Sequence, residues 1–149
     1  MKENKYFRQN RHSCYNLQYH LVLVTKYRKP AINDAVLDTI RGVIDNTFSK
    51  NKCEIIALNH DTDHIHLMFV APPQVCLSNM INSIKTVSSR LIRRDHTAWV
   101  NRFYRDSVFW SRSYYIGSVG DTTSEIVKLY VENQRKEQGV SLSPPKSDI

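Results

Sequence analysis

His64-Ile65-His66-Leu67-Met68-Phe69-Val70 is the stretch that decides the fold. Successive side chains of a strand point to opposite faces of a sheet, so its alternation predicts a half-buried strand. One face is apolar and consists of Ile65, Leu67 and Phe69. The other face carries His64, His66 and Met68. We therefore expect helices to cover the apolar face and the two histidines to lie on the open face.

Further strands are expected on both sides of this stretch. Residues 15–27 alternate and are rich in β-branched and aromatic side chains, which predicts a strand. Residues 53–58 form another, and the polar residues 59–63 join it to His64 as a hairpin. Residues 113–119 are typical of a fourth strand.

Three helices are expected between and after these strands. Apolar residues recur at spacings of three and four in residues 34–50 and again from Leu77 to Ile92. The second of these helices ends in the basic residues Arg90, Arg93 and Arg94. A last helix is expected over residues 122–137, where Thr122 and Glu125 fit a capping box.

This order of elements predicts an α+β fold of the ferredoxin-like (split βαβ) type, an antiparallel sheet with helices on one face and an extra C-terminal helix. Residues 14–137 are expected to form the single folded domain. Residues 1–13 are expected to form a flexible basic arm. Residues 138–149, with Gly139, Pro144 and Pro145, are expected to form a disordered tail.

Charge favours a polyanionic partner. Among 149 residues, 21 are Lys or Arg and 14 are Asp or Glu, which gives a net charge of +7. Nucleic acid is the leading candidate. Four glycines form neither a phosphate loop nor a dinucleotide fingerprint, which argues against nucleotide-driven chemistry.

Cysteine usage and hydropathy point to a cytoplasmic protein. The three cysteines have unrelated spacings, so we expect free thiols in a reducing compartment. The first ten residues are too polar for a signal peptide, and no apolar run is long enough to cross a bilayer.

Two side-chain pairs suggest chemistry. His64 and His66 lie roughly 7 Å apart at their roots, close enough to share an ion. Tyr130 and Gln134 lie four residues apart, on one face of the last helix. Each pair also has a structural interpretation: two histidines on a solvated sheet face, and a tyrosine filling a buried helical stripe.

Together the pairs predict a divalent ion held by His64, His66 and the Gln134 amide oxygen, with Tyr130 as nucleophile toward a phosphodiester. Three neutral ligands leave the ion its full charge for phosphate oxygens. A covalent phosphotyrosine conserves the energy of the phosphodiester bond, so strands can be cut and rejoined without ATP. Asp63 is the candidate for orienting a histidine.

Several motifs carry a resemblance to a known family. Asp63-His64-Ile65-His66-Leu67 and Tyr130-Val131-Glu132-Asn133-Gln134 occur with Tyr15-Asn16-Leu17-Gln18-Tyr19-His20-Leu21-Val22. Two further motifs are Thr25-Lys26-Tyr27-Arg28 and the stretch from Trp110 to Gly120, and all of these motifs occur in the order and spacing of one known family. In these motifs the chain resembles the single-tyrosine HUH transposases (TnpA type) of the smallest bacterial and archaeal insertion sequences, over nearly all of residues 14–137.

The resemblance implies a homodimer that cuts single-stranded DNA at hairpin-bearing element ends and forms a 5′-phosphotyrosine, with Mg²⁺ or Mn²⁺. In such dimers the tyrosine helix of one subunit can complete the histidine site of the other. Thr62 and Thr86 depart from the family pattern, which often has proline and glycine there; Thr86 puts hairpin preference in doubt.

The basic residues expected to contact DNA are interleaved with aromatic residues, which suits phosphate contacts combined with base stacking. They are Lys26, Arg28, Lys29, Lys85, Arg90, Arg93, Arg94 and Arg112. His20 and His60 could approach the ion from neighbouring strands, although hydrogen bonding in the core or a loop is the simpler role.

Two other functions stay open at this point. One is a noncatalytic module that binds single-stranded nucleic acid, although the stacking motif of RNA-recognition domains is absent. The other is a metal-dependent hydrolase with His60, His64 and His66 on zinc and Asp63 as base. The hydrolase would leave Tyr130 with no role, and a tyrosine-dependent covalent adduct separates the transposase from both alternatives.

Overall fold

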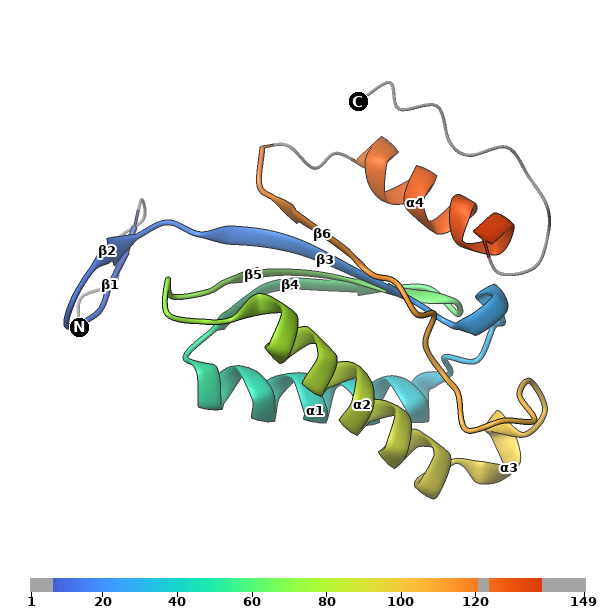
Figure 1. Ribbon diagram of the computed structural model, residues 1–149. Coiled ribbons are helices and arrows are strands. Elements are labelled where there is room, and N and C mark those ends of the chain that lie inside the picture. The colour runs from blue at the N-terminus through green and yellow to red at the C-terminus, as the bar shows by residue number, and fades with distance from the viewer. Residues whose placement is uncertain (1–6, 121–123, 138–149) are drawn as a thin grey trace.

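Four antiparallel strands form the central sheet of the computed structural model, which describes residues 7–120 and 124–137. Their order is β4 (Glu54–His60), β5 (His64–Val70), β3 (Gln18–Val24) and β6 (Tyr115–Ser118). Two long helices, α1 (Asp34–Asn51) and α2 (Leu77–Asp95), cover one face of the sheet. Helix α4 (Ser124–Glu137) lies on the other face (Figure 1).

The connectivity confirms the predicted ferredoxin-like fold. Along the chain the elements run β3, α1, β4, β5, α2 and β6, and β5 lies between β3 and β4 in the sheet. This is the split βαβ arrangement. Strand β5 has the predicted bounds, and pairs with β3 so that Val22 lies opposite His66 and Val24 opposite His64.

The N-terminal part differs from the expected strand and the expected flexible arm. Arg8–Gln9 (β1) pairs with Cys14–Tyr15 (β2) in a separate two-stranded sheet. Within residues 7–13 the arm is therefore partly paired rather than loose. Figure 1 shows this hairpin projecting from the body of the protein, and an ion pair between Arg8 and Glu54 ties it to β4.

The predicted strand over residues 15–27 also ends early. β3 stops at Val24 because a short 3₁₀ turn, η1 (Lys26–Arg28), follows it. Tyr27 and Arg28 have φ values of 57° and 55°, a left-handed conformation that costs about 1–3 kcal/mol for residues other than glycine. The turn must therefore be held by its surroundings.

The helices follow the predicted pattern with small changes in length. The Asn33 side chain caps α1 by accepting a hydrogen bond from the Val36 amide. Helix α2 runs to Asp95, and a short helix, α3 (Thr97–Val100), was not predicted in the segment after it. Helix α4 is described from Ser124. The capping residue Thr122 and the predicted tail, residues 138–149, lie outside the described residues.

Two apolar clusters hold the layers together. The larger lies between the sheet and helices α1 and α2 and includes Ile65, Leu67 and Phe69 of β5. The smaller lies on the open face, where Val22 and Val24 of β3 meet two valines of α4, Val127 and Val131. Among the described residues, helix α4 therefore rests on a smaller apolar contact than α1 and α2 do.

Candidate functional site

The two histidines of β5 lie on the open face, as the alternation predicts. Ile65, Leu67 and Phe69 are fully buried beneath the helices. His64 and His66 are half-buried on the opposite face.

A cavity of about 300 Å³ lies between these histidines and α4. Its lining combines basic, acidic, apolar and imidazole groups. The lining residues are Arg28, His64, His66, Val127, Lys128, Val131 and Glu132. Two cations beside a histidine pair favour an anionic ligand such as a phosphodiester.

Asp63 connects the histidines to the η1 turn. One of its carboxylate oxygens accepts a hydrogen bond from His64 Nδ1 at 2.7 Å, and the other accepts from Arg28 Nε at 2.7 Å. Burial raises the pKa of the Asp63 carboxyl, but the bonds from His64 and Arg28 outweigh it, so the pKa lies below its usual value. Asp63 is therefore an anion that orients His64 and leaves its Nε2 for another partner.

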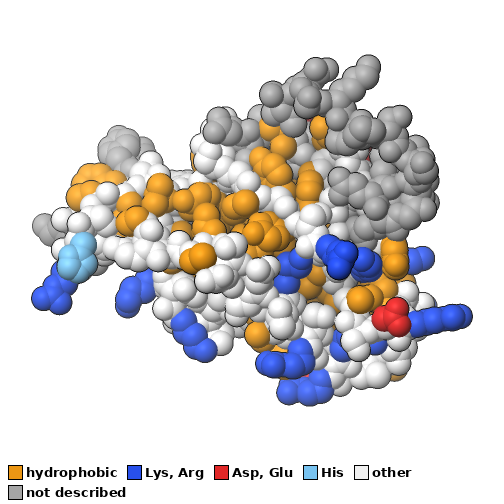
Figure 2. Space-filling model, viewed as in Figure 1, with side chains coloured by type: hydrophobic (Ala, Val, Ile, Leu, Met, Phe, Trp, Pro, Cys, Tyr) orange, Lys and Arg blue, Asp and Glu red, His pale blue; other side chains and the backbone are white. Residues whose placement is uncertain are grey.

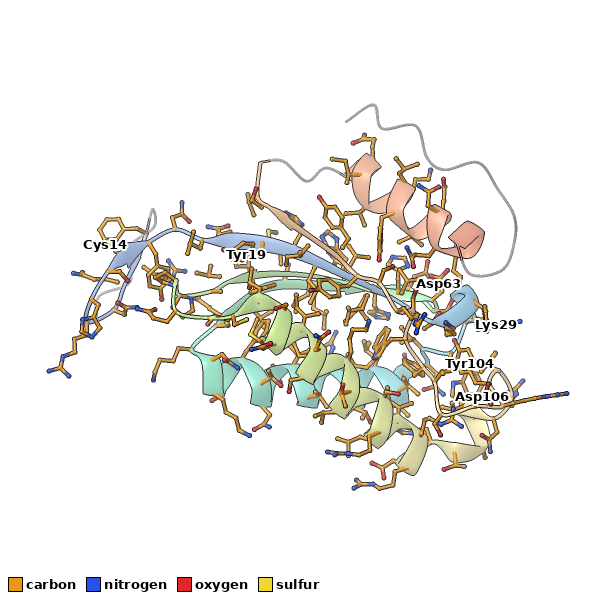
Figure 3. The ribbon with its side chains drawn as sticks, viewed as in Figure 1. Cys14, Tyr19, Lys29, Asp63, Tyr104 and Asp106 are labelled. Carbon is orange, nitrogen blue, oxygen red and sulfur yellow. The ribbon has the colours of Figure 1, made fainter. Side chains whose placement is uncertain are left out.

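Hydrogen bonds hold the strained η1 turn against this carboxylate. The Tyr104 hydroxyl donates to the Lys26 carbonyl at 2.7 Å, and the Thr25 hydroxyl lies 2.7 Å from the Lys29 carbonyl. Figure 3 shows Asp63, Lys29 and Tyr104 at the same end of the sheet, with Asp63 below α4 in this view. The turn thus positions Arg28 so that it lines the cavity beside His64 and His66.

His66 has a second histidine beside it. His20 Nδ1 lies 2.6 Å from His66 Nε2, and the two rings stack with their centroids 4.9 Å apart. Burial, followed by the charges of His20 and His64, holds the pKa of His66 below its usual value. Sequence reasoning favoured a simpler role for His20, because the contact depends on the register between β3 and β5.

Tyr130 and Gln134 share a face of α4 as predicted, but that face is turned toward the segment before β6. The Tyr130 hydroxyl lies 3.0 Å from the Ser113 hydroxyl. The Gln134 amide oxygen accepts hydrogen bonds from Ser111 at 2.6 Å and from Ser113 at 3.1 Å. Neither Tyr130 nor Gln134 is among the described residues that line the histidine cavity.

The side chains near His64 and His66 determine how a metal ion could be bound there. In the described part of the chain, no three His, Cys, Asp or Glu side chains are grouped to hold a metal ion. Two imidazoles with an amide oxygen suit a divalent ion that accepts nitrogen and oxygen ligands. Within this chain the Gln134 oxygen is held by two serines.

The zinc hydrolase interpretation is not supported by the position of His60. His60 lies opposite Ile65 in the pairing of β4 with β5, so its side chain is on the helix-covered face, away from His64 and His66. It lines a different cavity, with Asp61 and Trp99.

The predicted DNA-binding residues fall into separate groups. Lys85, Arg90, Arg93 and Arg112 line a cavity of about 540 Å³ between α2 and residues 107–112, and no Asp or Glu of the described residues lines it. Lys26, Arg28 and Lys29 belong to or follow η1. Arg94 is paired with Asp95 and does not line this cavity. Figure 2 shows Lys and Arg side chains spread over the part of the visible surface where α1 and α2 lie, with few acidic side chains among them.

Sequence reasoning missed two residues of the histidine cavity, Lys128 and Glu132. They lie one turn apart on α4, beside the stripe formed by Val127 and Val131. The helical spacing of this polar pair next to two buried valines was the available signal.

Comparison with known proteins gives the family. The family described as "Transposase IS200 like" matches residues 13–134. The ISDra2 transposase TnpA of Deinococcus radiodurans is 25% identical over 131 residues, which are 88% of this chain and 93% of that protein. The transposase for insertion sequence element IS200 of Salmonella typhimurium is 29% identical over 136 residues, 90% of this chain and 88% of that protein.

Two solved structures resemble this chain in fold. A crystal structure described as a transposase from Deinococcus radiodurans R1 has a TM-score of 0.76 and 28% identity, and the match covers 85% of this chain and 97% of that one. The structure of a REP-associated tyrosine transposase bound to a REP hairpin has a TM-score of 0.53 over 94% of this chain and 75% of that one. At 11% identity this second likeness supports the fold alone.

These matches confirm the resemblance drawn from the motifs. The helices in residues 7–120 and 124–137 are all too short or too polar to cross a membrane. The chain belongs to the IS200-like transposases, metal-dependent single-tyrosine enzymes that act as DNA endonucleases and strand transferases.

Proposed function

We propose that Tyr130 is the nucleophile with which this chain cuts and rejoins single-stranded DNA at the ends of an insertion sequence, acting in the cytoplasm. The Tyr130 oxygen bonds to phosphorus while the bond from phosphorus to the 3′ oxygen breaks. Tyr130 loses its hydroxyl proton and the leaving 3′ oxygen takes one up, so the products are a 5′-phosphotyrosine and a 3′ hydroxyl. In the reverse step a 3′ hydroxyl attacks the phosphotyrosine and releases Tyr130.

His64 and His66 are the proposed protein ligands for Mg²⁺ or Mn²⁺, with the Gln134 amide oxygen as third ligand. When bound, such an ion neutralises charge on a nonbridging phosphate oxygen and on the leaving oxygen. Asp63 orients His64, since it holds the Nδ1 atom of that ring. Arg28 and Lys128 line the same cavity, where their charges favour the phosphodiester.

The observation that carries the proposed assembly is the direction of the tyrosine face of α4. Tyr130 and Gln134 contact Ser113, whereas valines, Lys128 and Glu132 of the same helix face the histidines. A functional dimer in which Tyr130 of the partner subunit enters the histidine cavity accounts for both facts. The small apolar contact under α4 is consistent with exchange of this helix between subunits.

The proposed substrate is a single strand with a hairpin near the cleavage site. The basic cavity between α2 and residues 107–112 offers four cations to phosphates without a lining carboxylate. Burial and the charge of Lys26 lower the pKa of Lys85, so this lysine gains from an anionic neighbour. The solved relative described as bound to a REP hairpin is of the same fold.

A covalent adduct tests the proposal. Labelled single strands from both flanks of the gene are mixed with protein and Mn²⁺ or Mg²⁺, and a denaturing gel is run. We expect an adduct with the native chain and with Tyr115→Phe, whose ring packs 5.7 Å from that of Tyr130. We expect none with Tyr130→Phe, which should still bind DNA.

The outcomes separate the candidate functions. An adduct that survives Tyr130→Phe contradicts the proposed nucleophile. An adduct that forms in chelator contradicts the metal site. Tight binding without any adduct favours a noncatalytic module.

A further inference from the structure

The contact between His20 and His66 joins two strands on the open face of the sheet. His20 lies opposite Met68 in the pairing of β3 with β5, which makes it a diagonal neighbour of His66. The nitrogens His20 Nδ1 and His66 Nε2 are 2.6 Å apart, and the rings stack at an interplanar angle of 30°. This geometry is that of a hydrogen bond between two imidazoles.

Such a bond restricts where the protons lie. A hydrogen bond between two ring nitrogens forms only when one nitrogen carries a proton and the other does not. A neutral imidazole has one nitrogen that donates and one that accepts. The bond therefore couples the two tautomers: when His66 donates from Nε2 to His20 Nδ1, the Nδ1 atom of His66 carries no proton and can bind an ion.

We infer that His20 is a positioning residue that holds the His66 ring in one orientation and one tautomer, as Asp63 does for His64. This inference rests on the proposed role of His66 as a metal ligand. Histidines that bind metals nearly always have their other ring nitrogen held by a neighbour. Asp63 holds His64 at Nδ1, and His20 contacts His66 at Nε2.

Three variants of the full-length protein separate positioning from packing. His20→Asn keeps a polar atom close to the place of Nδ1, whereas His20→Leu fills the space without one. His60→Leu is the matched control, because His60 is an exposed histidine at the end of β4 that lines a different cavity. Thermal denaturation of all three shows whether each variant is folded.

Two measurements are made without DNA: Mn²⁺ affinity by titration calorimetry, and the tautomer of His66 by ¹⁵N NMR of the metal-free protein. We expect His20→Leu to weaken Mn²⁺ binding about 10- to 100-fold and His20→Asn to restore most of it. His60→Leu should bind as the native chain does. The NMR spectrum should show one His66 tautomer in the native chain and a mixture in His20→Leu.

The inference is overturned if His20→Leu binds Mn²⁺ as tightly as the native chain, or if His20→Asn is as weak as His20→Leu. Failure of the proposed metal site has a different signature, namely Mn²⁺ binding that His64→Ala leaves unchanged. In that case the NMR spectrum of the metal-free protein tests the role of His20. A mixture of His66 tautomers in His20→Leu supports the positioning role, and a single tautomer unchanged from the native chain overturns it.

Discussion

The hydroxyl groups of Tyr130 and Ser113 lie 3.0 Å apart, and Ser113 also donates to the Gln134 amide oxygen. Ser113 thus contacts both the proposed nucleophile and the proposed third metal ligand. As long as these bonds form, the tyrosine face of α4 stays against the segment before β6. Helix α4 must give up these contacts before Tyr130 can enter any histidine cavity.

Ser113→Ala should therefore speed up adduct formation. The change removes the bonds to both Tyr130 and Gln134, each of which contributes about 0.5–1.5 kcal/mol, so it raises the population of displaced α4 by about 5- to 150-fold. The measurement is the initial rate of adduct formation at saturating DNA, with Ser118→Ala of β6 as control. A slower rate in Ser113→Ala means that Ser113 assists the tyrosine instead of holding it back.

Sharing of α4 between subunits can be tested by mixing two inactive variants. Tyr130→Phe and His64→Ala each lack one half of the site. In a shared arrangement, half of the randomly mixed dimers are heterodimers and each has one intact site, so about a quarter of the native activity returns. If each chain uses its own tyrosine, every site carries a defect and the mixture stays inactive.

The sequence was sufficient for the parts of the fold that depend on local pattern. The alternation in His64–Val70 predicted both the bounds of β5 and the face of each histidine. Asp63 was predicted to orient a histidine because it is adjacent to His64, and it contacts that ring. Local spacing also placed Tyr130 and Gln134 on one face of α4.

The rest depends on contacts between distant segments. The contact of His20 with His66 follows from the register of β3 against β5, which local alternation does not define. The stripe of α4 that includes Val127, Tyr130 and Gln134 spans a wide arc. Which part of it faces the histidines is decided by Ser111 and Ser113 on another segment.

Asp63→Asn should weaken metal binding. The change removes the negative charge that accepts from His64 Nδ1, and loss of such a contact typically costs 10- to 100-fold in metal affinity, so we expect a change of about that size. Asp61→Asn is the matched control, since Asp61 is exposed in the same turn and accepts from the Thr62 amide. Titration with Mn²⁺ checks both, and equal affinities for the two variants would count against an orienting role for Asp63.

Arg90→Ala should weaken DNA binding more than Arg94→Ala does. Both side chains are exposed on α2, one turn apart, but only Arg90 lines the basic cavity, whereas Arg94 is paired with Asp95. Removing one phosphate contact lowers the slope of log affinity against log salt by about 1. Binding of a labelled hairpin strand at several salt concentrations measures it. Equal slopes for the two variants would exclude the basic cavity as the phosphate contact.

Tyr104→Phe should destabilise the protein at neutral pH and make its stability less sensitive to alkali. The Tyr104 hydroxyl is buried and donates to the Lys26 carbonyl, a bond that contributes about 0.5–1.5 kcal/mol. Burial raises the pKa of this hydroxyl well above its usual value. Above about pH 10 the unfolded chain loses a proton that the folded chain keeps, so the contribution of Tyr104 is present below that pH and is lost as the pH rises.

Urea denaturation at pH 7 and at about pH 10.5 tests this, since that pH lies above the ordinary pKa of tyrosine. The native chain should lose more stability between the two pH values than Tyr104→Phe does. Tyr27→Phe is the control, because the Tyr27 side chain lies in the same turn and is 50% exposed. If Tyr104→Phe matches Tyr27→Phe at both pH values, the Tyr104 hydroxyl does not hold the η1 turn, and the bonds of Thr25 to Lys29 and of Arg28 to Asp63 remain as its supports.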